Sequence, residues 1–247
     1  MLPRDDPTTL SLLFHLNSEP WLNEEAYKGA AHPRPAEGPA VVGDAVPLPR
    51  VAPSPLVDLL LARRSSRSFL HTTLTLAEVA AVLQAAYGVV EVDRSGDGLL
   101  RRSVPSAGGL FPLDVYVFLH RVEGVGPGLY RYDAETASLD LLREGDQFEA
   151  LRPELYPYPM VENANVILAL VATFTRTQAK YGPRGYRYIL LEAGHVGQNV
   201  CLRAVELGLG SLCMGGYADA RLNRMLGLDP RQAGVVYTVA IGRPAPG

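Results

Sequence analysis

Residues 165–173 read Asn-Val-Ile-Leu-Ala-Leu-Val-Ala-Thr, a run that is apolar at every position between its ends. A strand without alternation of apolar and polar residues is covered on both faces, so this run predicts an interior strand of a sheet. The segment Val235–Ile241, which reads Val-Val-Tyr-Thr-Val-Ala-Ile, predicts a second interior strand. Other elements must therefore pack against both sides of the sheet.

The chain between these two strands predicts a long buried helix over Tyr188–Leu207. Apolar and small residues recur there at helical spacing, namely at Ala193, Val196, Gly197, Val200, Ala204 and Leu207. Leu191, Cys201 and Leu202 cover much of the remaining surface. A helix that is apolar nearly all round lies in the core or at a subunit interface. Small residues at Gly194 and Gly197 would let another helix or a ring pack closely, and Gly208 ends the helix.

The chain before residue 165 predicts two more helices and three more strands. A helical pattern begins at Pro55. A second helix begins after Thr75, because Thr75 and Glu78 have the spacing of a capping box, and it continues to about Tyr87. β-Branched and aromatic residues predict strands over Val115–Leu119, Gly128–Asp133 and Ser138–Leu142. The second and third of these strands are expected to form a hairpin.

Residues 1–54 differ from the rest of the chain because they carry many prolines. Proline excludes a long helix or a central strand, so we expect an extended N-terminal arm that packs on the core or on a partner subunit. Residues 55–247 are then expected to form a single domain, and the short apolar patch around His15 belongs to the arm.

Composition excludes several classes of protein. The 247 residues are 47% hydrophobic and 20% charged, with a net charge of −3 and no block of like charges. We therefore expect a globular protein with no nucleic-acid or membrane partner. Cys201 and Cys213 lie in apolar stretches without a histidine at metal-ligand spacing, so they are expected to be buried thiols in a reducing compartment, with no metal. No signal-peptide core precedes the domain, which favours the cytoplasm.

Two segments suit an anionic or planar ligand, although each has a simpler interpretation. Arg63–Phe69 reads Arg-Arg-Ser-Ser-Arg-Ser-Phe. Its arginines could cap the negative end of the preceding helix, or they could bind a phosphate through guanidinium forks. Pro105–Pro112 reads Pro-Ser-Ala-Gly-Gly-Leu-Phe-Pro and could be a tight turn into a strand, or a loop whose backbone amides hold an anion or a flat ring.

Together with two later segments, these strings resemble a known family. RRSSRSF (63–69), PSAGGLFPLDVYVF (105–118), GLYRYD (128–133), KYGPRGYRYILLEAGHVGQN (180–199) and LGLG…GGYAD (207–219) look like the successive motifs of SagB-type dehydrogenases. These flavoenzymes are related to nitroreductases and include the azoline (thiazoline) oxidases of modified-peptide biosynthesis. The resemblance covers about residues 55–244. It implies an α+β nitroreductase-like fold, with a central mixed, mainly antiparallel sheet flanked by helices, in an intertwined homodimer that binds flavin mononucleotide (FMN) at its interface.

The resemblance also implies which residues bind FMN, and it draws them from both subunits. They are Arg63, Arg64, Ser65, Arg67, Pro105, Ser106, Ala107, Gly108, Gly215, Gly216 and Arg243. The first arginines and Ser65 would hold the phosphate and ribityl chain, whereas Arg67 would face the N1–C2=O edge of the flavin and stabilise its reduced form. Residues 105–108 would come from the other subunit. Gly215 and Gly216 would present amides to the N5–O4 edge. Because the sequence lacks the long basic tail of many nitroreductases, Arg243 is the C-terminal phosphate candidate.

Lys180 and Tyr181 resemble the Lys-Tyr pair of the azoline oxidases and are the predicted catalytic residues. Aromatising an azoline requires a base to take a carbon-bound proton while hydride passes to flavin N5. An uncharged lysine could serve, and the cations of Arg184 and Arg187 nearby in sequence would favour that form. The alternative is an ordinary solvated lysine.

Other polar residues have structural interpretations. A histidine in the middle of a mostly apolar helix, here His195, is expected to be a hydrogen-bonded core residue. A buried Glu192 would need a cationic partner, for which Arg67 and Arg203 are candidates. The loops over 91–102 and 146–163 are expected to shape the substrate pocket, the second as a lid.

Three functions remain open from the sequence. The first is dehydrogenation of a thiazoline or oxazoline in a modified peptide, with electrons passing from FMN to oxygen, beside a cyclodehydratase partner. The second is an NAD(P)H-dependent nitro- or quinone reductase, in which NAD(P)H reduces the flavin. The third is a non-catalytic flavin-binding subunit of a peptide-modifying complex. Function resides in the site rather than in the fold, so the fold alone does not choose among them.

Overall fold

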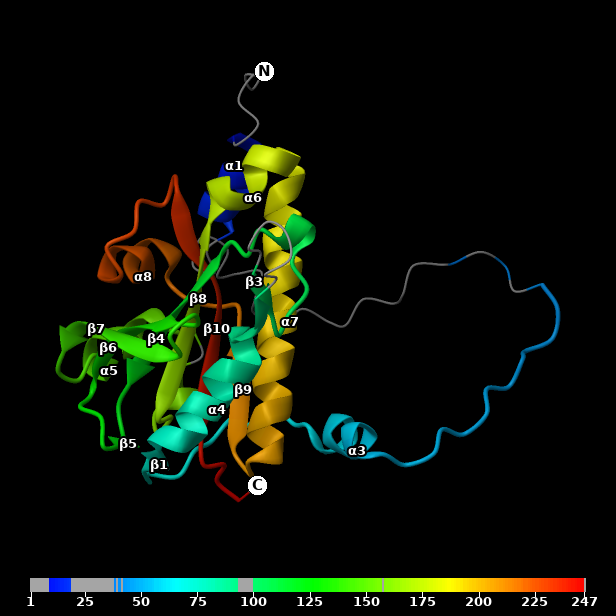
Figure 1. Ribbon diagram of the computed structural model, residues 1–247, viewed down its shortest axis with the longest axis horizontal. Helices are drawn as coiled ribbons and strands as arrows, with labels where there is room; N and C mark the ends of the chain where they lie inside the picture. Colours follow the sequence, from blue (N-terminus) through cyan, green and yellow to red (C-terminus); the bar gives the residue numbers. More distant parts are fainter. Residues whose placement is uncertain are drawn as a thin grey trace.

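The computed structural model describes residues 9–18, 38, 40, 42–92, 100–156 and 158–246. Its main sheet has six strands in the order β7-β6-β4-β8-β10-β9, and every neighbouring pair is antiparallel (Figure 1). The strands of this sheet are β4 Leu113–Leu119, β6 Gly128–Asp133, β7 Ser138–Glu144, β8 Val166–Thr173, β9 Gly210–Met214 and β10 Ala233–Gly242. The expected α+β class is confirmed.

Four short strands form two small sheets of two strands each. They are β1 Leu74–Thr75, which pairs in parallel with β5 Val122–Glu123, and β2 Val89–Val92, which pairs antiparallel with β3 Leu100–Arg102.

Helices cover both faces of the main sheet, which makes three layers (Figure 1). The α-helices of the described chain are α1 Thr9–Asn17, α3 Pro55–Ala62, α4 Leu76–Tyr87, α5 Phe148–Leu151, α6 Phe174–Tyr181, α7 Arg184–Glu206 and α8 Asp219–Met225. Short 3-10 turns are η2 Ala107–Gly109, η3 Arg152–Glu154 and η4 Tyr158–Val161. α4 and α7 lie on one face, and α5 and α8 lie on the other. No helix in the described part of the chain is long and apolar enough to cross a membrane.

Strand β8 explains why the sheet needs both layers. Its alternate residues belong to two separate clusters of buried side chains. Leu168 and Leu170 pack under α4 and α7, whereas Ile167 and Val171 pack under α5 and α8. The interior strand predicted at 165–173 is therefore confirmed.

The long helix α7 is confirmed, but it begins four residues earlier than predicted, at Arg184. Pro183 occupies its N-cap, a position near a helix start where proline's missing N–H costs little. The close packing expected at Gly197 is present, because a Cβ there would lie 2.7 Å from the Tyr237 ring. Leu190 and Leu191 stay exposed, so the outer side of α7 carries two leucines that no other part of the described chain covers.

The predicted local signals are also confirmed. The Thr75 side chain accepts a hydrogen bond from the Glu78 N–H, and the Glu78 carboxylate accepts one from the Thr75 N–H at 2.9 Å, as a capping box requires. β6 and β7 form the expected hairpin. The helix predicted from Pro55 is α3, and it has no buried residue although its sequence is Pro-Leu-Val-Asp-Leu-Leu-Leu-Ala.

The described parts of the proline-rich segment behave in two ways. Residues 42–54 extend away from the body, with Val42 97% and Leu48 88% exposed (Figure 1). By contrast, α1 packs on α6 and α7, although residues 1–54 were expected to be an extended arm. There His15 Nδ1 lies 2.9 Å from the Tyr186 hydroxyl, and Gln178 donates to Ser11 Oγ at 2.7 Å. The rest of the predicted arm lies outside the described residues.

The docking of α1 can be tested at Gly234, on β10, where a Cβ would lie 2.7 Å from His15 Nε2. We expect Gly234→Ala to lower the free energy of unfolding by about 1–3 kcal/mol, because overpacking a close contact displaces His15. In a His15→Ala background the same change should cost clearly less. Urea unfolding of the four proteins measures the coupling. Equal costs in both backgrounds would show that α1 does not dock here.

Candidate functional site

The predicted catalytic pair lies against the double-glycine turn. A Cβ built on Gly108 would lie 2.7 Å from the Tyr181 hydroxyl and 2.9 Å from Lys180 Nζ. Lys180 Nζ also lies 5.4 Å from the centre of the Tyr181 ring, and that ring packs edge-on against Tyr188. The two motifs are far apart in the sequence, so tertiary folding brings them together.

The turn over residues 105–111 is conformationally strained. Gly108 and Gly109 have positive φ angles of 66° and 65°, which glycine tolerates. Phe111 has a φ of 42°, which is rare for a bulky residue and costs free energy that the surrounding contacts must offset. The Phe111 N–H donates to Ser106 Oγ at 2.9 Å, and this hydrogen bond closes the turn.

Glu192 of α7 anchors this turn from below. Its carboxylate accepts hydrogen bonds from the Ser106 hydroxyl and, at 2.7 Å, from the Tyr87 hydroxyl. Glu192 is only 3% exposed, and burial raises the pKa of its carboxyl although Ser106, Tyr87 and Arg102 act in the opposite direction. The Arg102 guanidinium lies 4.6 Å above the centre of the Tyr87 ring.

The partners expected for Glu192 were wrong. Arg203 instead pairs with Glu206 on its own helix, and the electrostatic influence on Glu192 comes from Arg102 and His195 rather than from Arg67. The Ser106 and Tyr87 hydroxyls satisfy the buried carboxylate through hydrogen bonds, and the charge of Arg102 stabilises its ionised form. His195 is exposed, so the expectation that it is a core residue was also wrong.

The arginine-rich segment 63–67 lies beside the start of β9. The Ser66 N–H donates to the Ser211 carbonyl at 2.9 Å, and a Cβ on Gly210 would clash with the Ser66 side chain. Arg64 donates to the carbonyls of Leu61 and Arg63, so its guanidinium caps the end of α3. This is the simpler of the two interpretations of the segment, and it holds for Arg64.

Arg63 and Arg67 differ from Arg64. Within the described residues, neither forms an ion pair with a carboxylate. Two guanidinium groups thus remain available for an anion.

The remaining predicted cofactor residues lie apart from one another. Arg243 donates to Glu78 at 2.6 Å, so the free chain directs this guanidinium to the first turn of α4. Gly215 has open space where a side chain would begin. Gly216 pairs with Tyr156, whose N–H donates to the Gly216 carbonyl at 2.9 Å, which brings the predicted lid against this glycine.

Two groups of the predicted residues lie at opposite ends of α7. Lys180, Tyr181 and the 105–108 turn lie near its start, beside α6, whereas α3 and the segment that follows it lie near its end (Figure 1). Tyr188 contacts the first group, and Arg63 acts on Cys201, 13 residues further along the helix (201 − 188). At about 1.5 Å per residue, the two groups are separated by roughly 20 Å along α7.

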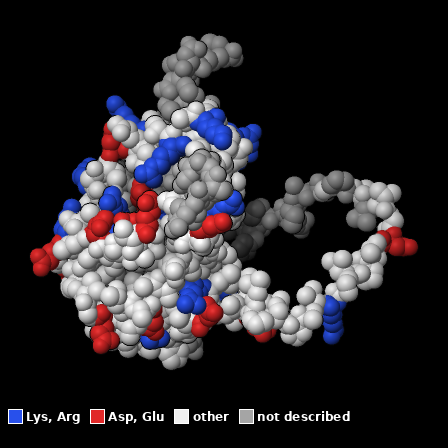
Figure 2. All heavy atoms as spheres, in the orientation of Figure 1, with Lys and Arg blue, Asp and Glu red and all other residues white. Residues whose placement is uncertain are grey.

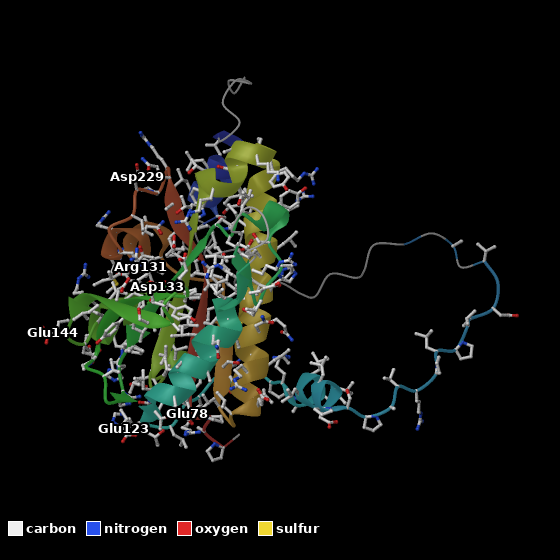
Figure 3. All side chains as sticks on the ribbon, viewed as in Figure 1. Glu78, Glu123, Arg131, Asp133, Glu144 and Asp229 are labelled. Atoms are coloured by element: carbon white, nitrogen blue, oxygen red, sulfur yellow. The ribbon has the colours of Figure 1, made fainter. Side chains whose placement is uncertain are left out.

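Two pockets lie beside α4 and β6, and the first of them borders the double-glycine turn. The first pocket has a volume of about 570 Å³. Gly109 forms part of its lining, together with acidic and basic side chains such as Arg102, Arg131 and Asp133. Arg131 and Asp133 lie close together on β6 (Figure 3). A second pocket of about 670 Å³ lies between α4 and the β6–β7 hairpin and is mainly apolar; Tyr132 lines both. Acidic and basic side chains are interspersed on the face shown in Figure 2.

Comparison with known proteins adds a family to this geometry. The model of a family described as "Nitroreductase family" matches residues 60–243. A Methanocaldococcus jannaschii protein described as a nitroreductase is 36% identical over 181 residues, which is 73% of this chain and 88% of that protein.

Two relatives are peptide-processing proteins. The microcin B17-processing protein McbC of Escherichia coli is 28% identical over 149 residues, and the trifolitoxin-processing protein TfxB of Rhizobium leguminosarum bv. trifolii is 29% identical over 136 residues. These matches cover 54% and 53% of this chain, but only 51% of McbC and 36% of TfxB. The resemblance to the SagB-type branch is thereby confirmed.

Solved structures confirm the fold. A chain of the E. coli microcin synthetase McbBCD complex with truncated pro-MccB17 bound superposes with a TM-score of 0.71 at 22% identity, covering 97% of this chain and 94% of that one. A nitroreductase of Desulfovibrio desulfuricans in complex with FMN gives 0.55 at 19% identity, covering 79% and 89%.

The contact between the turn and the catalytic pair can be tested with two neighbouring glycines. Gly108→Ala and Gly109→Ala both place a side chain at a positive φ, which costs about 1–2 kcal/mol. Only Gly108→Ala also meets Tyr181 and Lys180, because the space beside Gly109 is open. We expect Gly108→Ala to be the more destabilising by about 1–3 kcal/mol in urea unfolding. Removing the Tyr181 hydroxyl by Tyr181→Phe should shrink the difference, and equal costs of the two substitutions would contradict the contact.

Proposed function

The chain belongs to the nitroreductase family, and on that premise we propose that it is an FMN-dependent dehydrogenase that oxidises thiazoline or oxazoline rings in a modified peptide. The observation that carries the proposal is the contact of Lys180 and Tyr181 with the turn at Gly108. This contact joins a proton-transfer pair to a backbone segment suited to a planar ring.

The residues of the chain fit FMN. Arg63 and Arg67 are free of carboxylate partners in the described chain and suit a phosphate and a reduced ring. Gly215 has open space in place of a side chain, so its backbone can approach a ring edge. When bound, FMN supplies a hydride acceptor at N5. Arg243 completes the phosphate site in this proposal. To do so, its guanidinium must bind the phosphate while still paired with Glu78, or break that ion pair.

The residues of the chain would hold and move protons. Lys180 is exposed at the end of α6, and its amine takes the carbon-bound proton of the azoline. The Tyr181 hydroxyl, beside the same glycine, positions the ring nitrogen or the amine through a hydrogen bond. Glu192 holds Ser106 and so fixes the turn that carries Gly108. Charged groups in the pocket that begins at Gly109 would hold the flanking peptide.

The separation of the two groups of site residues supports a homodimer. A two-fold axis that brings the 105–108 turn of one copy to the Arg63–Arg67 segment of the other would create two complete sites. The exposed leucines of α3 and those at 190 and 191 of α7 supply an apolar surface for such an interface. A cyclodehydratase partner is proposed by analogy with the McbBCD complex.

The second candidate is an NAD(P)H-dependent nitro- or quinone reductase. It is favoured by the 36% identity to the M. jannaschii protein described as a nitroreductase. The two candidates differ in the reductant: anaerobic NADPH bleaches the flavin rapidly in a nitroreductase, whereas an azoline peptide bleaches it in an azoline oxidase. A third candidate, the non-catalytic flavin-binding subunit, predicts that neither does.

Lys180→Ala tests the catalytic assignment. We expect the variant to retain FMN, measured by its visible absorbance, and to lose about 10²–10⁴-fold in the rate of azoline dehydrogenation, the usual contribution of a general base. Mass spectrometry of the peptide follows the loss of two hydrogens per ring. Arg224→Ala, which removes an exposed cation from α8, is the control and should change neither quantity. A Lys180→Ala enzyme with full activity would exclude lysine as the base.

A further inference from the structure

The two cysteines of the chain are neighbours in space. Cys201 lies on α7 and Cys213 on β9, and their Sγ atoms are 3.5 Å apart. A disulfide has an S–S length of about 2.05 Å, so the sulfurs need to approach by roughly 1.5 Å to bond. The chain contains two cysteines in all, so each has one candidate partner within the molecule.

The surroundings make the two sulfurs chemically unequal. A hydrogen bond with Cys213 lowers the pKa of the Cys201 thiol to about 6 in spite of burial, and Ser211 and Arg63 act in the same direction. The same pairing, together with burial, raises the pKa of the Cys213 thiol. Because thiolates, not thiols, attack oxidants, the lowered pKa of Cys201 favours it as the attacking sulfur, and Cys213 lies 3.5 Å away to receive the second step.

We propose that Cys201 and Cys213 form a reversible oxidation site, which closes to an intramolecular disulfide when the protein meets hydrogen peroxide. The Cys201 thiolate attacks one peroxide oxygen, the O–O bond breaks, and hydroxide leaves, giving a sulfenic acid at Cys201. Cys213 then attacks that sulfur, the S–S bond forms, and its proton leaves with the departing hydroxyl as water. In total, two thiols and one peroxide give one disulfide and two waters.

The cysteine pair is linked through β9 to the arginine-rich segment. Ser211 lies on β9 between the start of the strand and Cys213, and its carbonyl accepts the Ser66 N–H of the arginine-rich segment. Drawing β9 toward α7 therefore acts on the segment that carries Arg63. The inference does not depend on the proposed activity, because it involves neither Lys180 nor a bound cofactor.

The test uses the purified full-length protein as isolated, treated with a slight excess of hydrogen peroxide under native conditions. The protein is then denatured, alkylated with iodoacetamide and weighed by mass spectrometry. We expect the oxidised protein to be two hydrogens lighter, to take no alkyl group, and to regain two alkylatable thiols after dithiothreitol. Digestion without reductant should yield one cross-linked peptide pair that contains both cysteines.

Three results would overturn the proposal: two thiols that stay alkylatable, added oxygen on one cysteine without loss of the other thiol, or a disulfide between two chains on a non-reducing gel. Single substitutions supply a second measurement. Cys213→Ser should leave a sulfenic acid at Cys201 that dimedone traps, whereas Cys201→Ser should leave Cys213 unlabelled at the same peroxide concentration. Circular dichroism checks that both variants fold, and the wild-type result stands even if a variant does not.

Discussion

The architecture around the candidate site depends on the burial of one carboxylate. Glu192 lies inside α7 at 3% exposure and is held by hydroxyls from α4 and from the 105–111 turn. A buried ionised group without such partners would be costly, so α4, α7 and the turn must keep their relative positions. This turn carries Phe111 at a positive φ and also Gly108, which faces Lys180 and Tyr181. Strain in the turn is thus balanced by hydrogen bonds that fix the glycine against which the predicted catalytic pair lies.

Two features of the described chain together support the proposed homodimer. The first is that the arginine-rich segment and the Gly108 turn occupy opposite ends of α7. The second is that α3 and the outer face of α7 expose leucines that nothing in the described chain covers. An antiparallel meeting of two copies would bury the leucines and join the two groups of site residues in one arrangement, which is why we propose the homodimer and the shared flavin site together.

Much of the fold could be predicted because it is encoded locally. The apolar run of β8, the capping box at Thr75 and Glu78 and the stripe of α7 each lie within one short segment. The site was predicted as separate strings, but not its connections. Ser106 and Tyr87 as partners of Glu192, the ion pair of Arg243 with Glu78 and the approach of the two cysteines all join residues from different elements. Hydroxyls are too common in a sequence to single out two of them. The exposure of His195 was missed because the outer face of α7 looks apolar in sequence whether or not the chain covers it.

The most direct test of the central claim, a flavin site built by two copies, is a mixed dimer. One copy carries Arg63→Glu and Arg67→Glu, the other carries Pro105→Trp, and each has its own affinity tag. Either variant alone should purify without FMN. In the dimer that carries both tags, one site receives its turn and its arginines from unaltered segments, so the account predicts about half the FMN content of the wild-type dimer. A mixed dimer that binds no FMN would contradict it.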